Sequence, residues 1–557
     1  MRHAHAIIPL VVSMPYMISL MSGKWDFLHI WDDNGNFLEN EMIQGLGTSN
    51  LISMFLEVRI NVNEPFSWIL KALTVSIFGL SSFHIRVVTL IFHVANTMLV
   101  YSLTRSLLPE ATNDLARIAT ALLWGLHPVQ AEVVGWPSAQ PYALSVFFAL
   151  LSVKAYVENK SHWISTVLYV ASVMSKSASI FLPVCFVCID FAKSDTALTF
   201  IDTAKTLIHR WTLKCPHFYV CGALVGLTMW ANHHGMQLDA DTYTLTHEER
   251  IGRVILSYSQ SILRILWPVD LRPHYRLKIR DVQLDSSHII LASTTLICFV
   301  LYSIVKWQRR RGIIATAVLC VATLAPVSGI INHGMVMISA DRYCYFLSLW
   351  IVPALTAWLS SSSSSTDEKS NKNNNMNLHI TIALIISAAF ATLSYHQFEI
   401  WRNPESFFEA SLSIDEADWR LLDIKSEHLL RQDRRDEAFK LMDVAIAHSP
   451  KNGIKALLNI GKFHVIRDEI QLACAAYVNA YHSVTSTGGQ PTGALHNNLG
   501  VCSLYVDAFQ EAHYHFQKGL EIGAVLPRHM EILEMNLVEF RKWDGVSAYR
   551  GGHQLIF

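Results

Sequence analysis

The segment Trp31-Asp32-Asp33-Asn34-Gly35-Asn36-Phe37-Leu38-Glu39-Asn40 follows the first apolar run of the chain, Ala6–Met21. It places two adjacent carboxylates and a tryptophan beside a run nearly long enough to cross a membrane. Ionisable residues are costly to keep near hydrocarbon, so this pair is a candidate functional site. The alternative is a turn at the membrane surface, because Asp, Asn and Gly are common turn residues. The rest of the chain has to decide between the two.

The composition is that of a membrane protein. Of the 557 residues, 51% are hydrophobic and only 16% are charged, and the mean hydropathy is +0.28. Ordinary soluble proteins are less apolar and carry more charge. The net charge of -1, without a basic stripe, argues against a nucleic-acid partner. The nine cysteines lie mostly in apolar runs, so we expect buried thiols rather than a disulfide framework or a zinc site.

Apolar segments recur along the first 395 residues. A membrane-spanning helix needs roughly 17 to 25 mainly apolar residues. The segments that meet or nearly meet this length are Ala6–Met21, His84–Leu103, Ile118–Val134, Tyr142–Val157, Trp163–Met174, Ile180–Phe191, Phe218–Ala231, Ile289–Trp307, Ile313–Ile331, Tyr343–Leu359 and Leu378–Tyr395. Two amphipathic or broken stretches, Phe66–Leu80 and Val254–Trp267, are expected to lie at the interface or to re-enter the membrane. We predict an all-α, polytopic membrane helix bundle with about eleven spans over residues 1–395.

Basic residues set the expected orientation of this bundle. Lys and Arg concentrate in Lys193–Lys214 and Lys306–Arg311, which the positive-inside rule places on the cytoplasmic side. With eleven spans, the loop of residues 23–83 and the C-terminal region then lie on the opposite, luminal side. The Ser- and Asn-rich stretch 360–377 is predicted to be a low-complexity cytoplasmic linker without a core.

Beyond residue 395 the composition becomes that of soluble helices, and an internal repeat appears. Small residues recur in pairs seven apart, at steps of 35 and 39 residues: Ala438 and Ala445, Ala473 and Ala480, and Ala512 and Gly519. Small residues where paired helices cross, at a period near 34, are typical of tetratricopeptide repeats. We therefore predict a short α-solenoid over residues 396–557, with an unrelated helical bundle as the alternative.

Several short motifs follow one another from the first loop to the start of the repeats. They are Trp31-Asp32-Asp33 with Asn36 and Asn40, Asn63-Glu64-Pro65, Phe78-Gly79, Arg86 with His93 and Asn96, His127-Pro128-Val129-Gln130-Ala131-Glu132-Val133-Val134-Gly135-Trp136, Ser175-Lys176, Asp190, Tyr258, Pro268, Leu271, Tyr275, Asp341-Arg342-Tyr343 and Trp401-Arg402-Asn403-Pro404. In this order, over nearly the whole chain, they resemble the transmembrane-and-tetratricopeptide-repeat (TMTC) family. Ser177 follows Lys176 where that family usually has Glu.

The resemblance implies a GT-C type glycosyltransferase of the endoplasmic reticulum membrane. Its expected donor is a dolichyl-phosphate sugar, above all dolichyl-phosphate mannose, and its expected acceptors are Ser or Thr hydroxyls of secretory-pathway proteins. Inverting transfer needs one carboxylate as general base. It also needs fixed positive charge to hold the departing phosphate. We expect no cofactor and no metal, because a monophosphate donor does not demand Mg²⁺.

The catalytic roles fall on the Asp pair. Asp33 is the expected base, with Asp32 orienting it or the acceptor, because adjacent carboxylates repel and one of them should hold a raised pKa. Arg342 and Lys176 are the candidates for binding the donor phosphate. Both lie near the ends of predicted spans, so anchoring at the membrane surface is the alternative for either.

Polar residues near the predicted second and third spans have less specific expectations. Glu132 and His127 are expected to shape the sugar pocket, although His127-Pro128 also reads as a helix terminator. His93 and Asn96 share one helix face, and we expect them to hydrogen-bond between helices rather than to catalyse.

Two other classes of function stay open. The chain could be a non-catalytic membrane scaffold in which the repeats bind a partner protein. It could also transport lipid-linked sugar, given the ionisable residues His93, Lys176 and Asp190 in or beside spans. In the transferase interpretation, the concave surface of the repeats presents acceptor protein to the active site, and lipid surrounds the spans.

Overall fold

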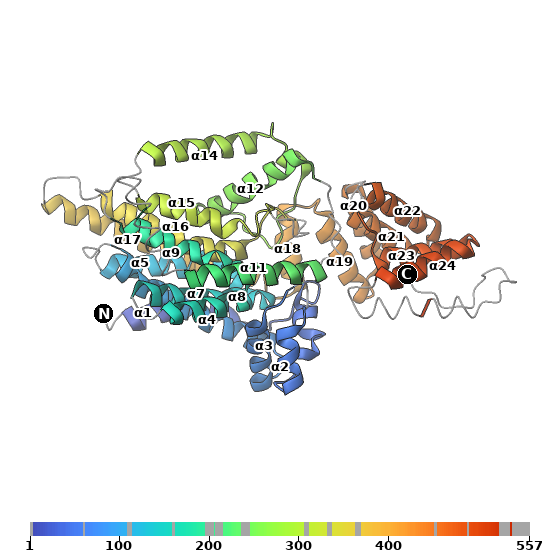
Figure 1. The fold of residues 1–557 in the computed structure, drawn as a ribbon, viewed down its shortest axis with the longest axis horizontal. Helices are drawn as coiled ribbons and strands as arrows, with labels where there is room; N and C mark the ends of the chain where they lie inside the picture. The colour runs from blue at the N-terminus through green and yellow to red at the C-terminus, as the bar shows by residue number, and fades with distance from the viewer. Residues whose placement is uncertain are drawn as a thin grey trace. The chain divides into compact units, whose positions relative to one another are not determined.

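The computed structural model describes residues 4–58, 62–108, 114–158, 162–194, 205, 215–235, 245–305, 311–330, 337–362, 369–449, 454–486, 489–522 and 535–536 (Figure 1). Within these ranges the regular elements are all helical, as predicted, and Arg276 and Met337 form an isolated bridge. The chain divides into two compact units. The first ends at Ile414, and the second consists of Asp415–Phe557 with two short earlier segments, Asn232–Thr246 and Gly334–Val336. The sequence analysis placed this boundary after residue 395.

The first unit is a bundle in which each predicted apolar segment coincides at least in part with a helix. Its helices are α1 Ala4–Met21, α2 Thr48–Leu56, α3 Pro65–Phe78, α4 Ser82–Leu107, α5 Asp114–Gly125, α6 Ala131–Gly135, α7 Gln140–Val157, α8 His162–Ser175, α9 Leu182–Lys193, α11 Cys215–Gly235, α12 His247–Leu266, α13 Ile279–Val282, α14 Ser287–Val305, α15 Arg311–Leu324, α16 Asp341–Ser362, α17 Lys369–Glu399 and α18 Pro404–Ile414.

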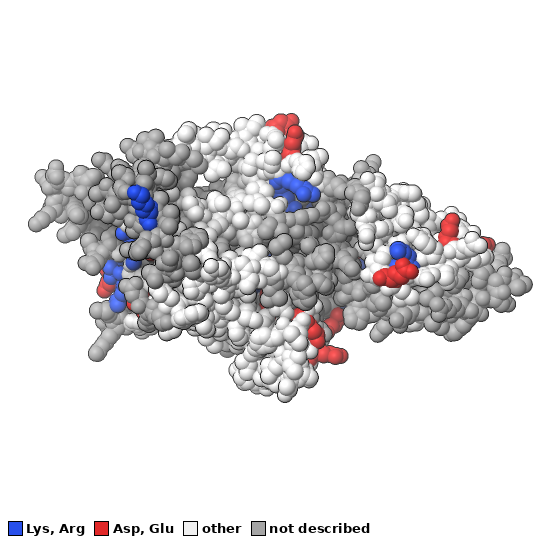
Figure 2. All heavy atoms as spheres, in the orientation of Figure 1, with Lys and Arg blue, Asp and Glu red and all other residues white. Residues whose placement is uncertain are grey.

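Four described segments are long and apolar enough to cross a membrane: Ala4–Met21, Ser82–Leu107, Pro137–Val157 and Ile380–Glu399. On the face shown in Figure 2, charged side chains of described residues form a few small groups, and most of the described surface is uncharged. Both observations fit a chain whose outer surface is solvated by lipid, because charge is costly there.

Two predictions about the bundle need correction. The predicted span Ile118–Val134 is not one helix, because α5 ends at Gly125 and a 3₁₀ turn over Pro128–Gln130 precedes α6. His127-Pro128 is therefore a helix terminator. The predicted linker 360–377 is helical at both ends, where α16 runs to Ser362 and α17 starts at Lys369; residues 363–368 lie outside the described residues. Most of the basic cluster 193–214, and residues 306–310 of the second, also lie outside them.

Buried polar side chains join α4 to its neighbours. His93 hydrogen-bonds through Nδ1 to the Tyr345 hydroxyl (2.9 Å) and donates through Nε2 to the Gly125 carbonyl (2.8 Å). Asn96 donates to the Ala143 carbonyl (2.9 Å). The expected interhelical hydrogen bonding of His93 and Asn96 is confirmed, and it satisfies polar groups that would be costly to leave unpaired in an apolar core.

The second unit contains three consecutive helix pairs. They are α19 Trp419–Arg431 with α20 Arg435–His448, α21 Ile454–Ile466 with α22 Ile470–Ser486, and α23 Gly493–Tyr505 with α24 Phe509–Ile522. The turn inside each pair holds an aspartate with positive φ, namely Asp433, Asp468 and Asp507 (59°, 62° and 57°). Asp tolerates this left-handed conformation better than most residues. These aspartates recur at the same steps as the small residues.

All six recurring small residues are buried, and two further glycines lie where paired helices approach each other. A Cβ added to Gly461 would meet the Tyr477 ring at 2.4 Å, and one added to Gly500 would meet the Phe516 ring at 2.6 Å. Glycine and aromatic ring are 16 residues apart in both pairs. The repeat found in the sequence is thus also a repeat of packing.

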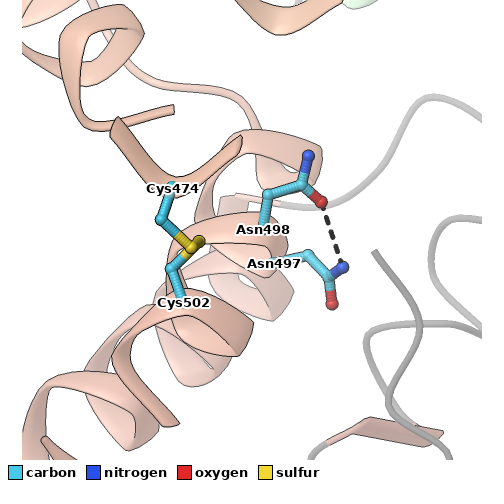
Figure 3. Close-up of a disulfide and its surroundings, with 4 residues drawn as sticks. All are labelled: Cys474, Asn497, Asn498 and Cys502. Carbon is cyan, nitrogen blue, oxygen red and sulfur yellow. Dashed lines mark hydrogen bonds between the residues drawn. A yellow bond between two sulfur atoms is a disulfide. The ribbon is translucent and has the colours of Figure 1, made fainter. Parts of the chain in front are cut away.

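A disulfide links two of these pairs. Cys474 of α22 is bonded to Cys502 of α23, with their Cα atoms 5.5 Å apart (Figure 3). The expectation that the cysteines are simply buried thiols is wrong for these two. They lie 28 residues apart in the sequence, and only the packing of α22 on α23 brings them within bonding distance.

Candidate functional site

The Asp pair occupies two different environments. Asp33 has no exposed surface, whereas Asp32 is exposed. Asp33 Oδ2 accepts a hydrogen bond from the Leu28 N–H (2.8 Å), and Oδ1 accepts from the N–H (3.2 Å) and the hydroxyl of Ser138. Ser138 belongs to the turn that precedes α7. The buried carboxylate therefore fastens the first loop to the start of α7.

Burial also changes the acidity of Asp33. Desolvation raises its pKa from the ordinary 3.8 to about 6, against the lowering effects of the Ser138 and Leu28 hydrogen bonds and of the Arg86 charge. The charge of Asp32 raises the pKa of Asp33 further. The adjacent pair thus has the expected split, with one carboxyl of raised pKa beside one in contact with water.

A buried cation that the sequence analysis did not single out lies behind the pair. Lys71 of α3 is 1% exposed and donates a hydrogen bond to Asn36 Oδ1, on the turn that follows the Asp pair. Its ammonium lies over the rings of Trp68 (4.0 Å) and Phe37 (5.1 Å). Its charge interacts with those of Asp32, Asp33, Glu64 and Lys176. A single lysine in the apolar stretch Phe66–Leu80 was the signal that could have found it.

The predicted phosphate ligand Lys176 is held in an ion pair. Its ammonium lies 2.6 Å from Glu64 Oε1 and 5.3 Å from the centre of the Tyr142 ring. Glu64 is buried, and four-fifths of the Lys176 side chain is covered. Lys176 therefore belongs to a polar cluster formed by Asp32, Asp33, Glu64, Lys71 and Lys176. It does not extend to the surface as an anchor.

Two further predicted residues, Arg342 and Glu132, are brought together across 210 residues of sequence. Glu132 Oε1 lies 2.6 Å from Arg342 Nη1, and Glu132 Oε2 accepts from the Arg342 backbone N–H at 2.7 Å. The guanidinium also faces the rings of Trp136 (5.2 Å) and Tyr343 (5.1 Å). Both carboxylate oxygens of Glu132 are committed to Arg342, so its place in the site is that of a partner to this arginine.

The predicted pocket residue His127 hydrogen-bonds to backbone groups of two segments. Its Nδ1 accepts from the Val129 N–H (3.3 Å), and its Nε2 donates to the Ile265 carbonyl (2.9 Å) at the end of α12. The side chain is 1% exposed. Both ring nitrogens are occupied, so His127 holds the end of α12 against the turn before α6.

Arg264, which precedes Ile265 in α12, forms another buried ion pair. Arg264 Nη1 lies 2.8 Å from Asp341 Oδ1, and the Tyr275 hydroxyl donates to the same oxygen at 2.7 Å. The sequence analysis named Tyr275 and Asp341 only within the family resemblance, and it missed Arg264. A lone arginine near the end of the stretch Val254–Trp267 was the available signal.

Aromatic residues connect these groups. Trp31, beside Asp32, contacts His274, beside Tyr275, with ring centroids 6.2 Å apart. A narrow cavity is lined by Tyr142, Ala178, Thr323, Val327, Tyr343 and Phe346. It has room for roughly one water molecule. Within the described ranges, no three His, Cys, Asp or Glu side chains converge as a metal site.

No protein-family model, curated protein or solved structure matches this chain.

Proposed function

We propose that this chain is a GT-C type membrane glycosyltransferase with an Asp general base. In this proposal it transfers a sugar, mannose from dolichyl-phosphate mannose, to Ser or Thr hydroxyls of secretory-pathway proteins. The observation that carries the proposal is the placement of an exposed carboxylate, Asp32, beside two lysines, Lys71 and Lys176, within one polar cluster of a largely apolar bundle. A hydroxyl nucleophile and an anionic leaving group need these two kinds of group side by side.

Within the pair, we assign the base to Asp32 and the positioning role to Asp33. The sequence analysis assigned them the other way round. Asp33 has no exposed surface, and its oxygens accept three hydrogen bonds from Leu28 and Ser138. A base must come within hydrogen-bonding reach of the acceptor hydroxyl, and of the two carboxylates Asp32 is the one at the surface.

The proposed step balances without a cofactor. The acceptor oxygen attacks the anomeric carbon, the bond from that carbon to the phosphate oxygen breaks, and the phosphate leaves with the bonding electron pair. The acceptor proton passes to the Asp32 carboxylate. Positive charge near the leaving oxygen stabilises the charge that develops there, most strongly where water is scarce.

The three helix pairs support a role in presenting the acceptor. We propose that they are tetratricopeptide repeats forming a short solenoid, a shape suited to extended polypeptide. The Cys474–Cys502 bond fits an oxidising compartment such as the lumen of the endoplasmic reticulum. We therefore propose a multi-pass protein of that membrane whose second unit faces the lumen.

The test measures transfer of radiolabel from dolichyl-phosphate mannose to protein in microsomes. It compares wild type with Asp32→Asn and Asp33→Asn. Glu41→Gln is the matched control, because Glu41 is an exposed acid of the same loop. We expect Asp32→Asn to reduce transfer about 10²- to 10⁴-fold at unchanged expression. Glu41→Gln should keep wild-type transfer.

Other outcomes favour other functions. Full transfer by Asp32→Asn would remove the assigned base. Absence of transfer by the wild type itself would favour the scaffold or another donor. Uptake of lipid-linked sugar into sealed vesicles without a covalent product would favour the transporter.

A further inference from the structure

Two guanidinium groups lie against one buried tyrosine at the end of α12. The Cζ atoms of Arg264 and Arg272 are 3.9 Å and 5.2 Å from the centre of the Tyr275 ring. Tyr275 is 6% exposed, and its hydroxyl accepts from the Arg272 backbone N–H at 3.1 Å. The segment after α12 is therefore folded so that two like charges share one aromatic surface.

These two arginines have hydrogen-bond donors to spare. Arg264 Nη2 and Arg272 Nε are buried, and no described residue accepts a hydrogen bond from either. Buried donors without acceptors are uncommon in native proteins, because each forfeits its hydration. By contrast, Lys176 and Arg342 have no buried donor atom of this kind beside their pairs with Glu64 and Glu132. The spare donor capacity of the site thus lies at Arg264 and Arg272.

The local charge favours an anion. Arg264 and Arg342 are paired with the carboxylates of Asp341 and Glu132. The Arg272 guanidinium lies against the Tyr275 ring, beside the Arg264–Asp341 pair. Three cations against two carboxylates leave one positive charge. A phosphodiester carries one negative charge, and its planar pair of oxygens suits the fork of an arginine better than the point charge of a lysine.

We propose that Arg264 and Arg272 bind the phosphate group of the lipid-linked sugar donor. This inference rests on the proposed function and names the residues that face the leaving group. The contact of Trp31 with His274 joins the Asp pair to the segment that holds these arginines. Arg342 and Lys176, the candidates from the sequence, then do not contact the phosphate directly, because each is paired with a carboxylate.

The test is binding of radiolabelled polyprenyl phosphate to the full-length protein in detergent, with inorganic phosphate as a second probe. Wild type is compared with Arg264→Gln and Arg272→Gln. Arg280→Gln is the matched control, because Arg280 is an exposed arginine of the same connection. Each of the two site variants should weaken binding of polyprenyl phosphate about 10- to 100-fold. The control should bind as wild type does.

Two variants keep the inference falsifiable. Arg264→Gln removes the positive charge paired with the buried Asp341 carboxylate, so this variant can harm folding. Arg272 has no carboxylate partner among the described residues, so Arg272→Gln breaks no ion pair there. Equal binding by Arg272→Gln and Arg280→Gln, in folded protein, overturns the site. Binding of inorganic phosphate but not of polyprenyl phosphate overturns the lipid donor as its ligand.

The same experiment separates this inference from the proposed function. Wild type that binds polyprenyl phosphate through these arginines but transfers no mannose keeps the anion site and refutes the transferase. Mannose transfer that persists unchanged in Arg272→Gln keeps the transferase and refutes the site.

Discussion

Asp33 is an ionisable residue that serves the fold of the first loop. Its carboxylate accepts hydrogen bonds from Leu28 and Ser138, so removing its charge also disturbs the loop. An amide at this position would turn one of its two acceptor atoms into a donor and set it against a backbone N–H. For this reason Asp33→Asn alone does not separate catalysis from folding. The test of the base is therefore the Asp32→Asn variant.

The raised pKa of Asp33 predicts a pH dependence of stability. Its folded value of about 6 lies above the ordinary 3.8. Between these values the folded state keeps a proton that the unfolded state has lost, so the free energy of unfolding falls as the pH rises. The fall from pH 4 to pH 7 should be about 2 kcal/mol. Thermal unfolding in detergent should show this fall in wild type and a smaller one in Asp33→Asn. The same pH dependence in both proteins would contradict the assignment.

Neutralising one partner of the buried Arg342–Glu132 pair should lower the free energy of unfolding far more than neutralising one partner of a more exposed pair. Glu132→Gln leaves the buried Arg342 guanidinium without its countercharge and should cost about 3–5 kcal/mol of unfolding free energy. Glu158→Gln removes the partner of Lys154, a pair spaced by four residues whose side chains are 28% and 30% exposed, and should cost less than about 0.5 kcal/mol. Denaturant unfolding of both variants measures the difference. Equal losses would show that burial does not govern the cost.

At the scale of elements, the three helix pairs of the second unit share one design. In the second and third pairs, a glycine of the first helix meets an aromatic ring 16 residues later on the second helix, where Gly461 meets Tyr477 and Gly500 meets Phe516. The turn between the helices is made by an aspartate in the left-handed region. Close approach of the two helices therefore depends on the absence of a side chain at the crossing point.

Gly461→Ala should open the second helix pair. The added methyl group would stand 2.4 Å from the Tyr477 ring, and the overlap should cost about 1–3 kcal/mol. Hydrogen exchange of peptides from α21 and α22 should accelerate. Gly312→Ala in α15, where a Cβ meets nothing within 4 Å, is the control and should leave exchange unchanged. Unchanged exchange in Gly461→Ala would mean that Tyr477 moves aside freely.

At the scale of the whole molecule, the chain combines an apolar bundle with a unit of helix pairs that carries a disulfide. Cys474 and Cys502 close a loop with a sequence separation of 28 residues, and such a bond typically contributes about 2–4 kcal/mol. Disulfides persist in oxidising compartments. In the orientation we propose from the basic residues and eleven spans, this unit would also lie away from the cytoplasm.

The location of the second unit can be measured in sealed microsomes. Trypsin added from outside should spare it, because the membrane shields it, and detergent should make it accessible. A non-reducing digest should yield the Cys474 and Cys502 peptides joined, and Cys502→Ser should abolish the joined species. Cleavage of the second unit in intact microsomes would reverse the proposed orientation.

The amino-acid sequence by itself determined the helical class, the position of most helices and the repeat of the second unit. These properties follow from local periodicity: runs of apolar residues, and small residues at steps of 35 and 39. It also pointed to Asp32, Asp33 and Lys176, because charge beside or within apolar segments is rare. It missed Lys71 and Arg264, which lie in such segments too.

Only the tertiary structure decided which of these residues meet. Arg342 pairs with Glu132 across 210 residues, and Lys176 with Glu64 across 112. The burial of Asp33, the spare donors of Arg264 and the Cys474–Cys502 bond likewise depend on how distant helices pack. Spacing along the chain carries no signal for such contacts, because each is selected by the three-dimensional arrangement of segments far apart in the sequence.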